Sequence, residues 1–191
     1  MPSSARRNQK NVPIALSLKQ PWAALVVLGY KTIEVRTWTT SYRGALLIHA
    51  ARQPDTRSVP WPIPDNARRL AELRGGILGR VELVDCLQYC DREQFVLDSA
   101  LHWNLPEWFA PPCMYGFVFR RPQLLPFVPC SGWFRLFRVP ALAVRQLKSG
   151  RQDSNLRPPG PKPGALAKLS YAPMFLDDFR SFVNRGPSRH C

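Results

Sequence analysis

The sequence lacks the usual marks of a membrane or secreted protein. No apolar run reaches the roughly 18 residues that a membrane span needs, and the opening MPSSARRNQKN is polar where a secretory signal has an apolar core. Acidic residues are also scarce, because 13 Asp and Glu stand against 27 Lys and Arg, a net charge of +14. We therefore expect a cytoplasmic protein without membrane association, and the positive charge favours a polyanionic partner.

Motifs of several enzyme classes are missing as well. The chain has no Gly-x4-Gly-Lys-Ser/Thr phosphate loop, no G-x-S-x-G elbow and no H-E-x-x-H zinc motif. The five cysteines are odd in number and irregularly spaced, which argues against a disulfide framework. Cys86, Cys90, His102 and Cys113 can be proposed as a metal site, but C-x3-C spacing is weak for zinc. Ordinary buried thiols are the favoured interpretation, so we expect no metal and no cofactor.

The positive charge is concentrated at the two ends of the chain. Residues 1–11 have a net charge of +3, and residues 145–191 have nine Lys or Arg against three Asp. Only +5 remains for residues 12–144, so part of the basic character can be a non-specific effect of the ends. We expect a flexible basic N-terminus over 1–11, one monomeric domain over 12–142 and a Pro-rich linker and tail over 143–191.

The first half of the domain combines one short helix with two strands. Residues 20–29 predict a helix, with Pro21 at its first position and Gly29 just past its end. The segment KTIEVRTW at 31–38 alternates with period two, and GALLIHA at 44–50 is a mostly apolar strand. The predicted polar face of the earlier strand consists of Thr32, Glu34, Arg36 and Trp38.

The second half adds further strands and short helices. Asp65 is a predicted helix cap, and Asp91 with Gln94 predicts a capping box. The expected elements are helices at 65–73 and 91–101 and strands at 75–89, 113–122 and 132–140. Five or six short strands with two or three short helices predict an α+β fold, a small closed or nearly closed β-barrel with flanking helices.

The tail departs from this pattern. Residues 149–166 have a cluster of prolines and no periodicity, which predicts an irregular, disordered or extended linker. Residues 171–184 place three Phe at helical spacing and are a candidate short amphipathic helix. The peptide QDSNL can also be back-translated so that its reverse complement contains GGTTCGAATCC, which is similar to the T-arm of a transfer RNA gene. Residues 149–191 are therefore either an ordinary Pro-rich tail or a non-evolved extension read antisense across such a gene.

The domain resembles a known family. Three patterns occur in fixed order between positions 16 and 50, namely L-S-L-x-Q-P-W-A, G-x-K-x-I-E-x-R-x-W and Y-R-G-x-L-L-I-H-A. They are similar to the ASCH (activating signal cointegrator homology) domain of the PUA-like superfamily, and GRVELVDC and YGFVFRRPQLLPF resemble later strands of that family. The resemblance implies a PUA-like β-barrel with a cleft beside the first helix that accepts RNA, DNA or a nucleotide-like small molecule.

The polar and aromatic residues of these patterns are the candidate ligand-binding set. Lys31, Arg36 and Arg43 suit phosphate groups, Trp22 and Trp38 suit base stacking, and Gln20 suits a base edge. Glu34 and His49 complete the set. Five of them have a structural alternative: Trp22 as a core residue, Gln20 as a helix cap, Glu34 with Arg36 as an ion pair, and His49 as a satisfied structural histidine.

A second hypothesis is a small amidohydrolase. Some compact relatives hydrolyse N4-acetylcytidine with a Lys, a Thr and a Glu, and this resemblance aligns their Lys with Lys31. Their Thr falls on Glu34, which removes the hydroxyl nucleophile, although the adjacent Thr32 is a conceivable substitute. Glu82 could occupy the position of their Glu. A carboxylate beside Lys31 favours the charged amine and weakens it as a base, so the binding module is the preferred hypothesis.

Overall fold

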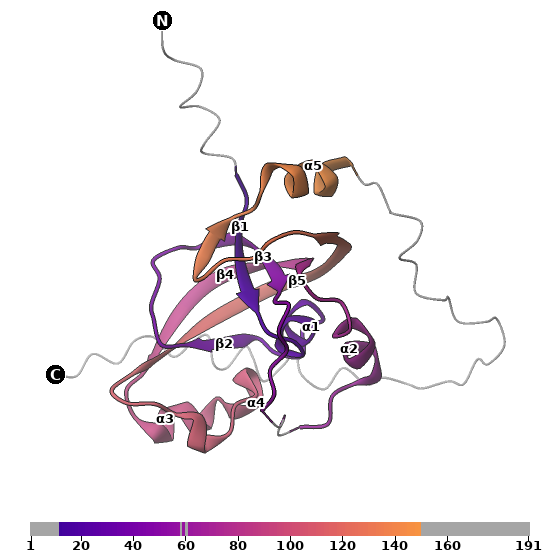
Figure 1. Cartoon of the computed structure of the whole chain (residues 1–191). Helices are drawn as coiled ribbons and strands as arrows, with labels where there is room; N and C mark the ends of the chain where they lie inside the picture. The colour runs from indigo at the N-terminus through magenta and orange to yellow at the C-terminus, as the bar shows by residue number, and fades with distance from the viewer. Residues whose placement is uncertain (1–11, 58, 60, 150–191) are drawn as a thin grey trace, which may run out of the picture. The chain divides into compact units, whose positions relative to one another are not determined.

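A computed structural model describes residues 12–57, 59 and 61–149 (Figure 1). The predictions for the basic N-terminus, the Pro-rich linker, the helix at 171–184 and the antisense extension lie outside these residues. None of the helices in the described part of the chain is both long and apolar enough to cross a membrane.

The core is one six-stranded mixed sheet. Its order is β2-β5-β4-β3-β1-β6, with β1 parallel to β3 and every other neighbouring pair antiparallel. The strands are β1 (Ile14–Leu18), β2 (Ile33–Arg36), β3 (Gly44–Ala50), β4 (Gly76–Tyr89), β5 (Met114–Pro129) and β6 (Leu136–Arg138). The expected α+β architecture is therefore present, and β3 has the predicted bounds.

The predicted barrel is wrong, because the sheet is open. Among the described residues the edge strands β2 and β6 do not pair with each other. They have only four and three residues, whereas the central strands β4 and β5 have 14 and 16. Register shifts bend the β4–β5 pair, but a barrel closes only when its edge strands meet along a shared register.

The strand β5 continues past the predicted end at Pro122. The ladder pairs Glu82 with Arg120 and then Arg80 with Gln123, so Pro122 falls within a register shift. A proline lacks the N–H that a regular ladder position needs, and a bulge removes that requirement. The long antiparallel β4–β5 ladder therefore continues past a residue that locally indicates a strand end.

Short helices flank the sheet. They are α1 (Trp22–Val27), α2 (Asp65–Leu70), α3 (Arg92–Leu97), α4 (Ser99–His102), a 3-10 turn at Pro106–Trp108 and α5 (Ala141–Ser149). Gly29, with φ of +82°, lies just past the end of α1 as predicted, and Asp91 caps α3 by accepting from the Gln94 N–H at 2.7 Å. Asp65 is the first helical residue instead of the cap, the predicted helix at 91–101 is divided into two, and α5 was not predicted.

The helix α1 is buried along its whole length and packs closely on the sheet. Its Val26 and Val27 join Leu46, Leu78 and Phe117 in the main core. Gly79 permits the close approach, because a Cβ atom there would lie 2.7 Å from the Val27 Cγ1 atom. This packing positions both ends of α1, where the candidate site residues lie.

One cysteine pair corrects the sequence analysis. Tyr89 and Met114 are the last paired residues of β4 and β5, so the next residue on one strand and the preceding residue on the other face each other. These are Cys90 and Cys113, and they form a disulfide with an S–S distance of 2.06 Å. Irregular spacing along the chain could not reveal this pairing, because only the antiparallel pairing of β4 with β5 brings the two thiols together. Within the described residues, no cluster of His, Cys, Asp or Glu is arranged to hold a metal ion.

Candidate functional site

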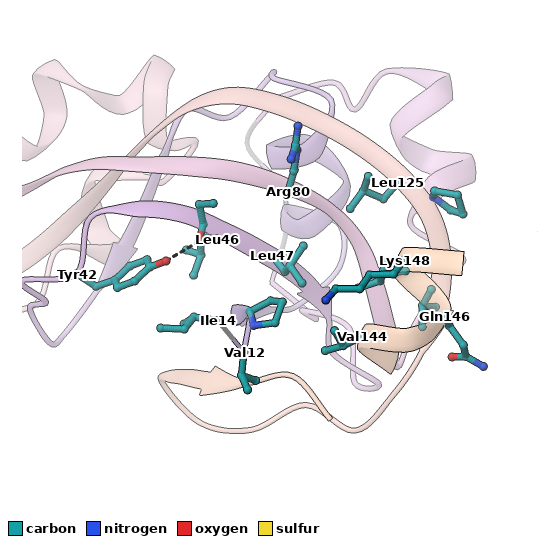
Figure 2. A pocket seen from close by; sticks show the side chains of 15 residues that line it. Val12, Ile14, Tyr42, Leu46, Leu47, Arg80, Leu125, Val144, Gln146 and Lys148 are labelled. Atoms are coloured by element: carbon teal, nitrogen blue, oxygen red, sulfur yellow. Dashed lines mark hydrogen bonds between the residues drawn. The ribbon is translucent and has the colours of Figure 1, made fainter. Parts of the chain in front are cut away.

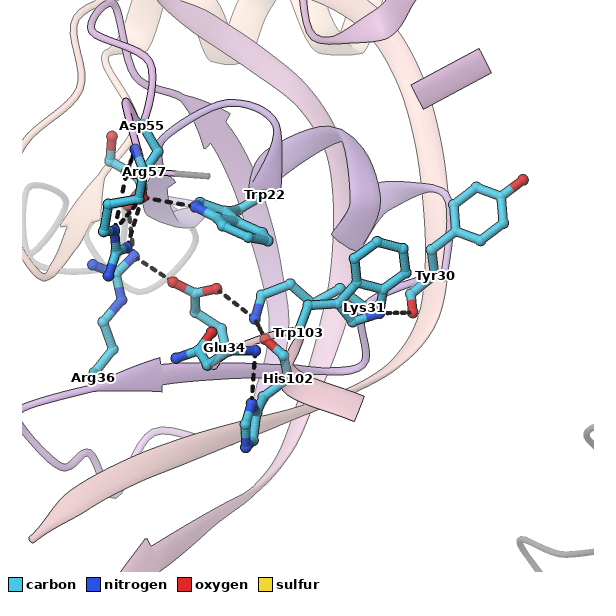
Figure 3. Close-up of polar contacts among 11 residues, drawn as sticks. Trp22, Tyr30, Lys31, Glu34, Arg36, Asp55, Arg57, His102 and Trp103 are labelled. Atoms are coloured by element: carbon cyan, nitrogen blue, oxygen red, sulfur yellow. Dashed lines mark hydrogen bonds and ion pairs between the residues drawn. The ribbon is translucent and has the colours of Figure 1, made fainter. Parts of the chain in front are cut away.

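Three charged residues of β2 and the turn before it form a continuous ionic chain (Figure 3). The Lys31 Nζ atom lies 3.4 Å from Glu34 Oε2, and Glu34 Oε1 lies 3.2 Å from Arg36 Nη2. Lys31 also donates to the backbone carbonyl of His102. Glu34 and Arg36 share one face of the strand, as predicted from the alternation, and Lys31 lies beside Glu34.

Asp55 and Arg57, in the loop after β3, form a second group with Trp22 and Trp108 next to these three charged residues. Trp22 donates from Nε1 to Asp55 Oδ2 at 2.8 Å, and Arg57 donates to both Asp55 oxygens at 3.0 and 2.6 Å. The Arg57 guanidinium stacks 4.1 Å from the ring centre of Trp108. The Trp22 ring lies edge-on to Trp108 and 5.5 Å from the Lys31 ammonium.

Sequence reasoning missed Asp55, Arg57 and Trp108. The first two lie in a Pro-rich loop without periodicity, and Trp108 lies in a short 3-10 turn far along the chain. The only local signal is an Asp two residues before an Arg, which is common in polar loops. Their contact with Trp22 depends on how separate loops fold over the end of α1.

Burial sets the protonation behaviour of this site. It lowers the pKa of Lys31 to about 8, while the neighbouring Glu34 opposes the shift. Hydrogen bonds from Arg57 hold the pKa of Asp55 well below its usual range. At neutral pH the group therefore carries three cations, Lys31, Arg36 and Arg57, against two carboxylates. The buried Nε atom of Arg36 has no hydrogen-bond partner among the described residues.

Two histidines support the group from either side. The Asn104 N–H donates to His102 Nδ1 at 3.0 Å, so His102 Nε2 carries the proton and donates to the Phe95 carbonyl at 2.7 Å. Burial lowers the pKa of His102, which keeps the ring neutral. This fixed ring holds the His102 backbone, and with it the carbonyl that receives the Lys31 ammonium.

His49 joins the same site through Ser17. Its Nδ1 atom lies 3.0 Å from the Ser17 hydroxyl, and its Nε2 atom lies 3.1 Å from the Cys130 carbonyl. The Ser17 carbonyl in turn accepts from Arg36 Nη2 at 2.9 Å. Burial lowers the pKa of His49, so the neutral ring supports the strand that positions Arg36.

Trp38 continues the site beyond Arg36. Its ring packs edge-on against Phe117 at 4.9 Å and is half-buried. The Arg135 guanidinium lies 5.6 Å from the Trp38 ring centre. No carboxylate in the described ranges lies within ion-pair distance of Arg135, so this side of the site adds another positive charge.

Three predicted site residues are not brought into the group. The Gln20 amide accepts from the N–H of Ala24 in α1 at 3.1 Å and donates to a carbonyl after α2 at 2.8 Å. Arg43 pairs with Asp85 at 3.2 Å, and Glu82 pairs with Arg121 at 3.2 Å. Gln20 therefore joins two helix ends, which was its structural alternative, and the two ion pairs belong to other parts of the sheet.

The site also differs from an open cleft lined by Trp22 and Lys31. These residues are only 5% and 2% exposed, and Glu34 is 8% exposed. The side chains of Arg36 and Arg57 are 26% and 54% exposed. Arg36 and Arg57 are therefore the accessible members of the charged group, and its buried residues hold them in position. The exposed Arg135 lies beyond them at Trp38.

A separate pocket of about 570 Å³ lies elsewhere in the domain (Figure 2). Its lining comes mainly from apolar side chains of β1, β3, β5 and α5, with Arg80 and Lys148 as its charged members. Among its lining residues are Ile14, Leu47, Leu125, Val128, Val144 and Leu147. No residue of the charged group lines this pocket, and the charged group remains the candidate site because of its chemistry.

Comparison with known proteins agrees with the arrangement of this domain. A family model described as ASCH domain matches residues 16–126. Activating signal cointegrator 1 of Homo sapiens is 38% identical over 155 residues, which cover 73% of this chain and 24% of that protein. The Mus musculus protein of the same name is 38% identical over 93 residues, covering 42% and 16% of the two chains. The chain thus spans a quarter or less of these relatives.

Solved structures from Zymomonas mobilis have a similar fold. The crystal structure titled ASCH superposes with a TM-score of 0.50 at 17% identity, covering 72% of this chain and 94% of that one. A point mutant of the same protein gives a TM-score of 0.52 at 15% identity, covering 73% and 98%. At this identity the likeness concerns the fold alone.

Proposed function

The chain belongs to the ASCH domain family, and from that premise we propose that it is a nucleic-acid-binding module that contacts an RNA strand through Arg36 and Arg57. The proposal is supported by the excess of cations over carboxylates in a group whose accessible members are both arginines. Arginine presents several N–H donors in a planar fork that matches the oxygens of a phosphate.

The observation that carries the proposal is the state of Arg36. Its Nη2 atom is held by Glu34 at 3.2 Å and by the Ser17 carbonyl at 2.9 Å, while its buried Nε has no partner within the described residues. A buried N–H without an acceptor is costly. A phosphate cannot reach this buried Nε atom, but it can contact the exposed part of the Arg36 side chain, whose orientation Glu34 and the Ser17 carbonyl already fix.

Arg57 supplies a second, more exposed cation. The Asp55 carboxylate and the Trp108 ring restrict its side chain, so little conformational entropy would be lost when it binds a phosphate. Lys31 lies beneath the surface and adds positive potential without direct access. Affinity based on such contacts falls steeply with salt because bound counterions are released.

A salt titration tests the proposal. The full chain is titrated into a labelled single-stranded RNA of about 12 nucleotides, and fluorescence anisotropy is recorded over a range of salt concentrations. We expect Arg36→Ala and Arg57→Ala each to weaken binding and to reduce the slope of log K against log salt by about 0.7, the value for one lost phosphate contact on a single strand. Circular dichroism verifies that both variants fold.

Arg145→Ala is the matched control, because Arg145 is an exposed arginine on α5, outside the site. It should leave the slope nearly unchanged. An equal loss in all three variants would mean that the net charge of the chain binds RNA without a defined site. Equal affinity for DNA of the same sequence would contradict the choice of RNA.

The lowered pKa of Lys31 is the one observation that favours the amidohydrolase alternative, because an amine with a pKa of about 8 is a better base than an ordinary lysine. Against it, position 34 is Glu instead of Thr, and Glu82 pairs with Arg121. Incubation with N4-acetylcytidine decides the matter. Release of cytidine that Lys31→Ala abolishes would establish the enzyme.

A further inference from the structure

The loop between β5 and β6 carries two exposed aromatic side chains. Trp133 is 71% exposed and Phe134 is 84% exposed. Their rings contact each other edge-on with centroids 6.2 Å apart. Such large neighbouring apolar side chains are usually buried, and their exposure is typical of a contact surface.

The base of this loop is held firmly against the site. The Cys130 carbonyl lies 3.1 Å from His49 Nε2. Gly132 packs so closely on the same ring that an added Cβ would lie 2.6 Å from His49 Nδ1. Arg135 follows with a positive φ of 54°, a conformation that few residues other than glycine adopt. The loop therefore presents its aromatic tip from an anchored base.

The aromatic tip continues the accessible edge of the site. In the β1–β6 ladder, Leu16 pairs with Leu136, which brings Ser17 next to Arg135. The Ser17 carbonyl is the acceptor of Arg36, and the Arg135 guanidinium lies over the ring of Trp38, which follows β2 two residues after Arg36. Cations that suit a phosphate backbone and rings that suit bases are thus neighbours.

We infer that Trp133 and Phe134 form a stacking platform for unpaired bases, so that the strand bound at Arg36 is single-stranded. This inference rests on the proposed function. Every base has a flat π-face that stacks on an aromatic ring. In a duplex these faces are stacked inside the helix and are unavailable to a side chain, whereas its phosphates remain accessible. The platform therefore favours single strands, while arginines alone bind both forms.

The test compares two RNA forms of the same sequence, single-stranded and duplex, with the wild-type full chain and with Trp133→Ala and Phe134→Ala. Neither substitution changes a charge. We expect each to weaken single-strand binding about tenfold, the loss of one stacked base, while duplex binding and the salt slope remain unchanged. Trp61→Ala is the matched control, since Trp61 is an exposed tryptophan in another loop.

Tryptophan fluorescence provides an independent measurement. Single-stranded RNA should quench the emission of the wild type more than that of Trp133→Ala, because stacking on Trp133 contributes to the quenching. If both aromatic variants bind both RNA forms like the wild type, while Arg36→Ala weakens binding, the platform is refuted and the proposed function stands. If the wild type binds neither form, both fall. Self-association that Trp133→Ala abolishes, with unchanged RNA binding, would make the loop a protein contact instead.

Discussion

Comparing the wild type with Lys31→Met should isolate the contribution of this one lysine to the pH dependence of stability. The Lys31 ammonium is almost completely buried, and burial lowers its pKa from 10.5 to about 8. Met has a similar length and apolar body but no titrating group. Glu34 keeps an ion pair with Arg36 at 3.2 Å in the variant, so its carboxylate is not left alone.

The direction follows from proton counting. Below about pH 8, Lys31 is protonated in both the folded and the unfolded chain, so it contributes no slope. Between about pH 8 and 10.5 the unfolded chain keeps the proton and the folded chain has lost it. The free energy of unfolding therefore rises with pH across this window, and it levels off above 10.5.

The size follows from the same two pKa values. One pH unit corresponds to about 1.4 kcal/mol, so the whole window is worth roughly 3 kcal/mol. Burial raises the pKa values of Tyr42 and Tyr89, so these two groups lower stability as pH rises further. These contributions are common to both proteins and cancel in the difference between wild type and Lys31→Met.

Urea unfolding of both proteins from about pH 7 to about pH 10.5 measures this difference. We expect the wild type to gain roughly 3 kcal/mol relative to Lys31→Met across the range. A flat difference would refute a buried lysine with a lowered pKa. If the variant does not fold, an NMR titration of Lys31 in the wild type replaces it, and a midpoint near 10.5 would refute the reasoning equally well.

Three further predictions concern the fold. Gly79→Ala should lower the free energy of unfolding by about 1–3 kcal/mol, because the new Cβ would meet Val27 at 2.7 Å; a stability equal to wild type in urea melts would contradict this packing. Asp91→Ala should cost about 1 kcal/mol through the loss of a 2.7 Å cap on α3, measured by thermal melts, and no change in Tm would argue against the cap. Changing Cys90 and Cys113 together to Ser should cost about 3 kcal/mol, because the disulfide joins residues 23 positions apart; equal melts of the reduced wild type and the double variant provide the check.

The local elements could be predicted because their signals are local. The apolar run at 44–50 is β3, the Gly29 turn ends α1, and Asp91 begins α3. The alternation at 31–38 correctly placed Glu34 and Arg36 on one face, where they form an ion pair. The predicted ends of helices and strands were less accurate where pairing with a distant strand outweighed the local signal. Pro122, for example, lies inside β5 because the β4–β5 ladder continues past it.

Sheet closure could not be predicted from the pattern of strands. The same number of short strands can form an open sheet or a closed barrel, because closure depends on whether the edge strands share a register. The helix α5 was missed for a related reason. The α5 sequence contains both apolar and polar residues without a clear helical signal. The helix is stabilised by packing, because Ala143 belongs to the same buried cluster as Ala15, Ile77 and Val128 of the sheet.

The sequence alone determined the family, the α+β class and the candidate residues Lys31, Glu34 and Arg36, because short-range patterns and strand alternation specify them. Only the tertiary structure decided which residues join them. It added Asp55, Arg57 and Trp108, separated Arg43 and Glu82, and buried Trp22 and Lys31 beneath two accessible arginines. The physical reason is that these contacts arise where distant loops pack over the end of α1, and burial and pairing there depend on neighbours that no local pattern specifies.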